Sequence, residues 1–240
     1  MSSYLNFDHY INEGWLQQPK ESFKALATHM RSHSANPCGQ LLDVGCATGE
    51  LLGYLSHQFP ELKPTGVDVF DALLTAGRAR MPATTFLNAS ALDLPIEFRE
   101  RFDFVTAVGV MSIFDEVQME AFWRNLLDVT APNGLIAVLS PLNEFGVDTV
   151  TRHRKRNPGS TLAWESGWNV FSTVTIEETL QKLGHIVSIE RFVFTPVLQQ
   201  REDPVRTWTL PTATNPHQLT NGLKLLVDHY FMLVKKQVVN

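Results

Sequence analysis

Residues 40–55 read QLLDVGCATGELLGYL and contain three successive patterns. The first, at 41–44, is a short apolar run of the length of a buried strand. Gly45 and Gly49 follow, and glycine suits a chain that must turn with positive φ or approach a ligand closely. From Glu50 onward, apolar residues recur at helical spacing. The stretch therefore predicts a strand, a glycine turn and a helix whose N-terminus can meet a ligand.

A carboxylate stands at a characteristic distance from this turn. Residues 64–69 predict a second strand with Asp68 at its end, 19 residues after Gly49. An acid about 20 residues beyond a glycine turn binds ribose hydroxyls in dinucleotide folds. Asp68 could instead cap the helix expected from Asp71, and the two roles are compatible.

Four segments, in order, resemble the class I S-adenosylmethionine (SAM) methyltransferases. Residues 41–49 resemble the family's motif I, with an Asp before Gly-Cys-x-x-Gly. Residues 84–95 resemble its third strand and loop, although Ser90 replaces the Asp that meets the adenine amino group. Residues 101–114 resemble its fourth strand, opened by a Phe-Asp pair, and 131–134 resemble the turn before its fifth strand.

The resemblance implies SAM as the cofactor and S-adenosylhomocysteine as the product. The family's ribose-binding acid corresponds to Asp68, and its methionine end lies over 43–49. The implied cofactor-binding residues are Asp43, Gly45, Cys46, Ala47, Gly49, Asp68, Val69, Ser90, Ala91, Leu92, Val108, Gly109 and Met111.

The alternation of strands and helices predicts an α/β fold with a doubly wound sheet. In the resembled family this sheet has seven strands in the order 3-2-1-4-5-7-6, with strand 7 antiparallel. We expect strand five at 135–139, strand six at 185–195 and strand seven at 229–236. Residues 1–37 are expected to form a helical flap before a SAM-binding methyltransferase domain at 38–240.

This domain is expected to carry two additions, a lid insertion at about 141–171 and a hairpin at about 203–228. Asn221-Gly222 predicts a two-residue type I′ turn in the hairpin, because both central positions of that turn need positive φ. Thr175 and Glu178 predict a capping box at the start of the helix after the insertion. Earlier in the chain, apolar residues at helical spacing predict an amphipathic helix over 23–30.

The insertion offers groups for the methyl acceptor. Four of the five residues 152–156 are Lys or Arg, in a chain of net charge −5. One interpretation is a solvated helical face; the other is that Arg152 and Arg156, which would share one face of a helix, bind an anionic acceptor. Trp164 and Trp168 are expected to line an apolar wall.

Methyl transfer from SAM is a displacement at an already activated carbon, so the protein must mainly align the acceptor and exclude water. A general base is needed only for an acceptor that arrives protonated. His9, Tyr10 and His153 are the candidates for that role. The segment after 108 lacks the Asn-Pro-Pro-Tyr type of sequence that many amino-methylating nucleic-acid and glutamine enzymes place there, which disfavours those substrates. We expect a small-molecule acceptor and favour O-methylation over N-methylation. A sugar or nucleotide-sugar acceptor stays open.

The composition and net charge of the chain limit the kinds of molecule that it is expected to bind. The chain has 240 residues, of which 44% are hydrophobic, enough for a sizeable core. Its negative charge argues against a general nucleic-acid binder. It has two cysteines and no apolar run long enough to span a membrane. His29 and His33 stand four apart but lack a third ligand, so no metal site is expected. We expect a cytoplasmic monomer or homodimer without a signal peptide.

Two other functions remain open. An NAD(P)-dependent oxidoreductase would show Gly-x-Gly-x-x-Gly, whereas Cys46 stands where that fingerprint places its second glycine. A SAM-binding regulatory protein would bind the cofactor without releasing S-adenosylhomocysteine.

Overall fold

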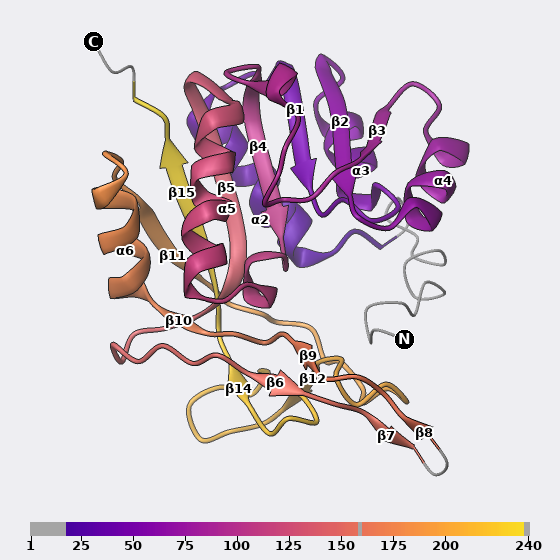
Figure 1. The fold of residues 1–240 in the computed structure, drawn as a ribbon, viewed down its shortest axis with the longest axis vertical. Helices are drawn as coiled ribbons and strands as arrows, with labels where there is room; N and C mark the ends of the chain where they lie inside the picture. Colours follow the sequence, from indigo (N-terminus) through magenta and orange to yellow (C-terminus); the bar gives the residue numbers. More distant parts are fainter. Residues whose placement is uncertain (1–17, 158–159, 238–240) are drawn as a thin grey trace.

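A central, mostly parallel sheet organises the protein, as shown by a computed structural model that describes residues 18–157 and 160–237 (Figure 1). Its strands lie in the order β11-β15-β5-β4-β1-β2-β3. β15 is antiparallel to both of its neighbours, β5 and β11. The strands are β1 (Gly39–Val44), β2 (Leu62–Asp68), β3 (Thr85–Asn88), β4 (Phe102–Val108), β5 (Thr130–Asn143), β11 (Ser188–Phe192) and β15 (His229–Lys235).

This order confirms the predicted one, with β11 as the sixth strand and β15 as the seventh. The fifth strand is longer than expected, because the expected turn at 131–134 lies inside β5. There Asn133 has a φ of 65°, and the pairing of β5 with β4 shifts register between Phe102 and Phe104. The turn chemistry is therefore present as an irregularity within a continuous strand.

Helices cover both faces of the sheet. α5 (Glu116–Val129) and α6 (Thr173–Lys182) lie on one face, and α2 (Glu21–His33) and α3 (Glu50–Gln58) on the other (Figure 1). α4 (Asp71–Arg80) packs on β2 and β3. Successive residues of β5 face alternate cores, and both sets are buried, as expected for a strand covered on both sides. Within the described ranges, no helix is long and apolar enough to cross a membrane.

The predicted amphipathic helix is confirmed as α2. Its buried face consists of Phe23, Leu26, Ala27 and Met30, which pack in the same core as residues of β1, β4 and β5. The flap expected at the N-terminus involves residues 1–17, which lie outside the described residues.

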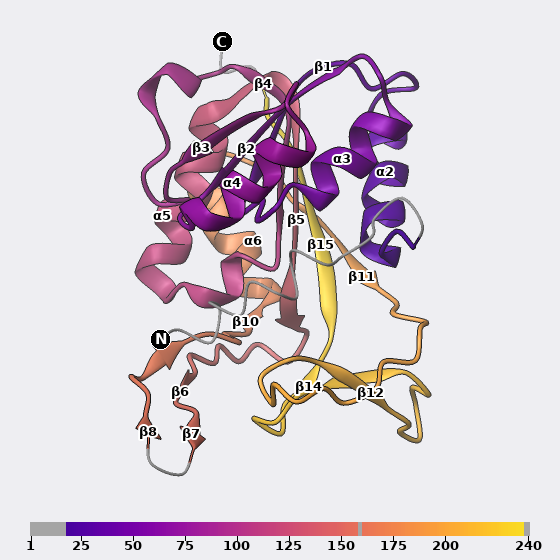
Figure 2. The ribbon, with the colours of Figure 1, turned by 90° about the vertical axis from the view of Figure 1, so that its right-hand side faces the viewer.

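Two smaller assemblies lie beyond the carboxyl ends of the parallel strands (Figures 1 and 2). The first, the insertion (residues 144–170), follows β5. The second, the C-terminal sheet, is formed by the part of the chain that connects β11 to β15. In Figure 2 it lies to the right of the insertion. The insertion holds β6 (Arg152–His153), β7 (Arg156–Asn157), β8 (Ser160–Thr161) and β9 (Glu165–Ser166), and the C-terminal sheet holds β12 (Trp208–Leu210), β13 (Gln218–Thr220) and β14 (Leu226–Val227). β10 (Phe171–Ser172) then returns the chain to pair with the end of β5.

The predicted hairpin exists, but its predicted two-residue turn is wrong. β13 pairs with β14 from Thr220 opposite Leu226, so five residues form the loop. Neither Asn221 nor Gly222 has positive φ. Asn221 is buried, and a Cβ added to Gly222 would lie 2.5 Å from the carbonyl oxygen of Pro204. The glycine thus permits close packing between two chain segments, which a sequence pattern for turns does not detect.

The predicted capping box of α6 is also wrong. The helix begins at Thr173, and its N-cap is Ser172, whose Oγ accepts a hydrogen bond from the Thr175 amide at 3.1 Å. Thr175 instead donates through its hydroxyl to Asp148 at 2.7 Å. The hydroxyl of Thr175, which the local pattern assigns to the cap, therefore bonds to the carboxylate of Asp148, 27 positions earlier in the chain.

Candidate cofactor and acceptor site

The glycine turn between β1 and α3 is held by backbone hydrogen bonds. The amides of Gly45 and Cys46 both donate to the carbonyl oxygen of Val67, at 2.8 and 3.0 Å. Gly45 has a φ of 75°, and a Cβ there would lie 2.3 Å from Cγ2 of Val110. Gly49 has a φ of 81° as the N-cap of α3. The turn therefore needs glycine both for its backbone angles and for contact with the loop after β4.

Asp68 joins this turn to the end of β2. One carboxylate oxygen accepts a hydrogen bond from the amide of Ala47 at 2.9 Å, and the other accepts from the amide of Phe70 at 3.0 Å. A carboxylate has about four lone-pair sites, so two bonds leave capacity for ligand hydroxyls. The side chain is fixed, buried and still an acceptor. It does not cap α4 directly, since the N-cap of that helix, Phe70, has no side-chain cap bond.

A cavity of about 270 Å³ opens beside Asp68, at the carboxyl ends of β1, β2 and β4. Ligands of open α/β folds bind at this edge. Eight of its lining residues are among those predicted for the cofactor: Gly45, Ala47, Asp68, Val69, Ser90, Ala91, Val108 and Gly109.

The other predicted cofactor residues do not line this cavity. Asp43, Cys46 and Met111 are buried, Gly49 is the N-cap of α3, and Leu92 is partly buried against the core. Six further lining residues were missed: Phe70, Leu73, Ala89, Val110, Ile113 and Phe114. All six side chains are apolar. Ala89, Val110, Ile113 and Phe114 lie inside the segments that resemble the family, at positions to which no role was given, and Phe70 and Leu73 lie at the start of α4, outside those segments.

Two buried side chains, Asp43 and Cys46, lie close to the residues that line the cavity. Asp43 accepts a hydrogen bond from the Thr106 hydroxyl at 2.7 Å. Burial raises the pKa of Asp43 to about 7, against the opposing effect of the Thr106 bond, and the nearby Asp68 charge adds to the rise. Burial also raises the pKa of the Cys46 thiol well above its ordinary value. Cys46 packs where a Cβ on Gly66 would lie 2.6 Å from its sulfur, so it fills space as a neutral thiol.

Ser90 lines the cavity at the position where the resembled family has an acid. Its Oγ accepts a hydrogen bond from the amide of Leu92 at 3.1 Å. A hydroxyl has two lone pairs and one proton, so Ser90 can still accept one bond and donate another. The serine therefore retains the acceptor that an adenine amino group requires, without the negative charge.

The basic run of the insertion is extended, so the helix expected there is wrong, and with it the shared helical face of Arg152 and Arg156. Arg152 lies in β6 and Arg156 in β7, and both side chains are exposed. Lys155 forms an ion pair with Asp203 at 2.7 Å, which connects the insertion to the segment before β12. Arg154 lies over the ring of Trp164, 4.8 Å from its centroid. Arg152 and His153 pair with Ser166 and Glu165 of β9, and Arg156 pairs with Thr161 in a short local hairpin, so the run extends instead of forming a helix.

The remaining predicted acceptor and catalytic residues are spread out. Trp164 is 54% exposed, and Trp168 is partly buried with a φ of 62°. His153 is buried inside the insertion, neither ring nitrogen has a hydrogen-bond partner among the residues that the structure describes, and burial lowers its pKa. None of these three lines the cavity beside Asp68. His9 and Tyr10 lie outside the described residues.

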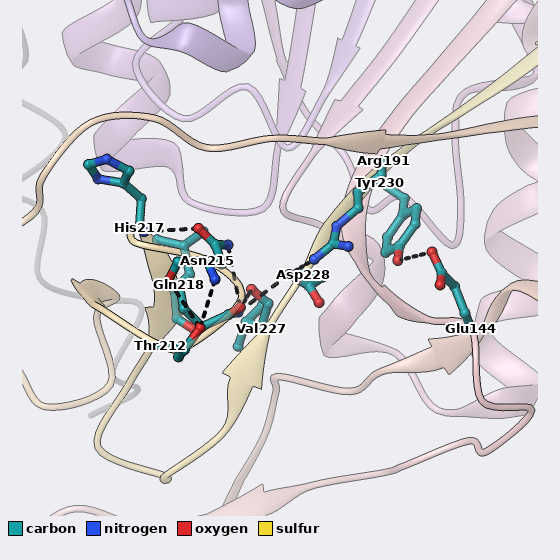
Figure 3. Close-up of polar contacts among 10 residues, drawn as sticks. Glu144, Arg191, Thr212, Asn215, His217, Gln218, Val227, Asp228 and Tyr230 are labelled. Carbon is teal, nitrogen blue, oxygen red and sulfur yellow. Dashed lines mark hydrogen bonds and ion pairs between the residues drawn. The ribbon is translucent and has the colours of Figure 1, made fainter.

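Polar contacts join the C-terminal sheet to the N-terminal end of β15 (Figure 3). Arg191 pairs with Asp228 at 2.9 Å, and Gln218 donates to the same carboxylate at 3.3 Å. The Tyr230 hydroxyl donates to Glu144 at 2.7 Å, and burial together with this bond raises the pKa of Tyr230 to about 12. These contacts attach both assemblies to one end of β15. No local sequence pattern indicates these contacts, because each joins residues at least ten positions apart in the chain.

Comparisons with known proteins bear on this arrangement. Residues 42–136 match the family model described as a methyltransferase domain. A trans-aconitate 2-methyltransferase of Acidovorax sp. (strain JS42) is 27% identical over 130 residues, covering 52% of this chain and 45% of that protein. A malonyl-[acyl-carrier protein] O-methyltransferase of Bacillus anthracis is 22% identical over 145 residues, covering 60% and 50%. The chain thus spans about half the length of these curated relatives.

Solved structures match over nearly the whole chain. The 1,6-didemethyltoxoflavin-N1-methyltransferase of Burkholderia thailandensis, solved with S-adenosylhomocysteine, has a TM-score of 0.62 at 13% identity, covering 98% of this chain and 86% of that one. The sugar N-methyltransferase KedS8 from Streptoalloteichus sp. has a TM-score of 0.60 at 16% identity, covering 99% and 94%. These likenesses establish the fold that the sheet order already indicates.

Proposed function

From the premise that the chain carries a methyltransferase domain and has the class I SAM-dependent methyltransferase fold, we propose that it transfers the methyl group of SAM to a small anionic acceptor, by O-methylation. The observation that carries the proposal is the cavity beside Asp68. The ribose hydroxyls bond to Asp68, the adenine lies toward Ser90 and Ala91, and the methionine end lies between Gly45 and Gly109. Eight predicted residues converging on one cavity support this placement.

The acceptor binds on the side of the insertion in this proposal. Arg152 and Arg156 are exposed and form no ion pair within the described part of the chain, so their guanidinium groups are available to a carboxylate or phosphate. Arginine binds such groups through two parallel hydrogen bonds. Binding places the acceptor oxygen in line with the carbon–sulfur bond of SAM, and the apolar side chains of Val110, Ile113 and Phe114 exclude water from that region.

An ionised acceptor removes the need for a base. Bound SAM would supply an activated methyl carbon to which a carboxylate oxygen could donate its electron pair as the bond to sulfur breaks, with neutral S-adenosylhomocysteine as the leaving group. A hydroxyl acceptor would require a group that takes its proton. His153 has the neutral state that a base needs, because burial lowers its pKa, and His9 and Tyr10 are the other candidates.

A second candidate is N-methylation of a nucleotide-linked amino sugar. The solved amino pentose methyltransferase CalS10 of Micromonospora echinaspora matches 99% of this chain and 98% of its own, with a TM-score of 0.59 at 14% identity. KedS8, a sugar N-methyltransferase, matches almost as completely. The diphosphate of such an acceptor would use the same two arginines.

The test is a panel of acceptors incubated with SAM, with release of S-adenosylhomocysteine and the mass of the product as readouts. The panel contains small di- and tricarboxylic acids, hydroxylated aromatic acids and nucleotide-linked amino sugars, each paired with a neutral ester or amide. Product formed from an acid but not from its neutral partner supports the proposal. Product from the amino sugars alone establishes the second candidate. SAM binding without turnover of any acceptor favours a regulatory protein.

A further inference from the structure

Asn169, near the end of the insertion, is completely buried and makes four hydrogen bonds. Within the insertion, its side-chain Oδ1 accepts from the amide of Thr151 at 2.7 Å, and its Nδ2 donates to the hydroxyl of Ser166 at 3.3 Å. These contacts fix the first and last strands of the insertion, β6 and β9, to one side chain.

The other two bonds of Asn169 leave the insertion. Its backbone amide donates to the carbonyl oxygen of Ser112 at 2.8 Å, and its Nδ2 donates to the carbonyl oxygen of Phe114 at 2.7 Å. Both carbonyls belong to the loop that follows β4 (residues 109–114), which includes the short helix η3 (Met111–Ile113). Four residues of this loop line the cavity beside Asp68: Gly109, Val110, Ile113 and Phe114.

Only an amide side chain fits this position. A backbone N–H lies on one side of the Asn169 carboxamide and a backbone carbonyl on the other, so one acceptor and one donor are required. An aspartate would place an oxygen against the Phe114 carbonyl, and an alanine would leave buried backbone groups unpaired. Since both neighbours are backbone, the orientation of the amide is determined by its partners.

We infer that Asn169 is a positioning residue that couples the insertion to the cofactor cavity and so sets where the acceptor lies relative to the methyl group of SAM. The inference rests on the proposed function. A ligand that orders the loop 109–114 stabilises the contacts of Asn169, and the insertion is stabilised in turn. Because linkage is reciprocal, an ordered insertion also strengthens the loop.

The coupling is measurable without an acceptor, by hydrogen exchange on the full chain with and without SAM. In the wild type, SAM should slow exchange in the loop 109–114 and also at Thr151 and Val170 in the insertion, which Asn169 joins to it. In Asn169→Ala and Asn169→Asp, the loop should still respond to SAM while the insertion does not. Calorimetry should give a SAM affinity within about threefold of wild type in both variants.

Asn143 supplies a matched control. It has the same side chain at the start of the insertion, and its two bonds, to Val147 and Phe145 at 2.7 and 2.9 Å, stay within a local turn. Asn143→Ala should therefore keep the response of Thr151 to SAM. With an acceptor in hand, kcat/KM should fall about 10- to 100-fold in the Asn169 variants and stay near wild type in the control, as expected for misplacement of a reacting group.

The outcomes separate the inference from the proposed function. If wild-type protein does not bind SAM, the proposed function fails and the inference fails with it. If SAM binds and protects the loop but leaves exchange at Thr151 unchanged in the wild type, only the inference is overturned, whatever the stability of the variants. An equal loss of coupling in Asn143→Ala would also overturn it, because general loosening of the insertion would then suffice.

Discussion

The proposed cofactor side of the molecule and the proposed acceptor side are built in different ways. Around Asp68, tight turns with positive φ at Gly45, Gly49 and Gly109 end long parallel strands, and backbone hydrogen bonds fix their positions. The insertion and the C-terminal sheet consist of strands of two or three residues, held by side-chain contacts such as Lys155 with Asp203. Backbone geometry therefore preorganises the cofactor cavity, while the acceptor side depends on individual side chains.

The largest effect is expected at the glycine turn. Gly45→Ala adds a Cβ that would lie 2.3 Å from Val110, in a backbone with a φ of 75°. The backbone should cost about 1–2 kcal/mol and the overlap a further 1–3 kcal/mol or so. SAM binding should be lost in calorimetry. Gly184→Ala, after α6 and away from the cavity, is the control, since it has a φ of 82° but no atom of the described residues within 4 Å of the added Cβ. An equal loss of SAM affinity in the two variants would show that the contact between position 45 and Val110 is not the cause.

The buried carboxyl group under the cavity predicts a pH dependence. The pKa of Asp43, about 7, lies above its ordinary value of 3.8. Between these values the folded state holds a proton that the unfolded state has released, so the free energy of unfolding falls as pH rises, by up to about 1.4 kcal/mol per unit. Asp43→Asn should gain stability relative to wild type as pH increases from 5 to 7 or so. If the free energies of unfolding of the two proteins changed with pH in the same way, the raised pKa of Asp43 would be contradicted.

On the acceptor side, replacing arginines should alter only acceptor kinetics. Arg152→Gln and Arg156→Gln should each raise the KM for an anionic acceptor about tenfold, since each removes a charge-assisted contact. The affinity for SAM should remain within about twofold. Arg99→Gln, an exposed arginine before β4, is the control. Acceptor kinetics close to wild type in the double variant would indicate a neutral acceptor.

The smallest effect concerns the return from the insertion into α6. Ser172→Ala removes the N-cap bond to Thr175 and should lower the free energy of unfolding by about 1 kcal/mol. Glu178→Ala, at the position that the sequence pattern assigns to the cap, should change it by less than about 0.5 kcal/mol. Thermal or denaturant unfolding measures both. If Glu178→Ala destabilised the protein more than Ser172→Ala, the predicted capping box would be supported instead.

The same contrast explains what the sequence could predict. The family resemblance implied the strand order and eight cavity residues, and it rests on local motifs, because Gly45, Gly49 and Asp68 have roles set by backbone geometry in the turns after strands. The methyltransferase resemblance read from those patterns is confirmed by the domain match. Patterns failed where distant partners decide. Thr175 donates to Asp148 across 27 positions of the chain, Pro204 packs on Gly222, and Arg152 pairs with Ser166 of β9. Asn169 had no local pattern at all.

The central claim, that SAM binds beside Asp68, is tested most directly by calorimetry of SAM with wild-type protein and Asp68→Ala. Asp68→Asn, which keeps one acceptor oxygen, is the intermediate variant. The account predicts binding to the wild type and a loss on the order of 2–4 kcal/mol in Asp68→Ala, because a carboxylate that accepts two ribose hydroxyls is removed. Absence of binding to the wild type, or unchanged affinity in a folded Asp68→Ala protein, would contradict it.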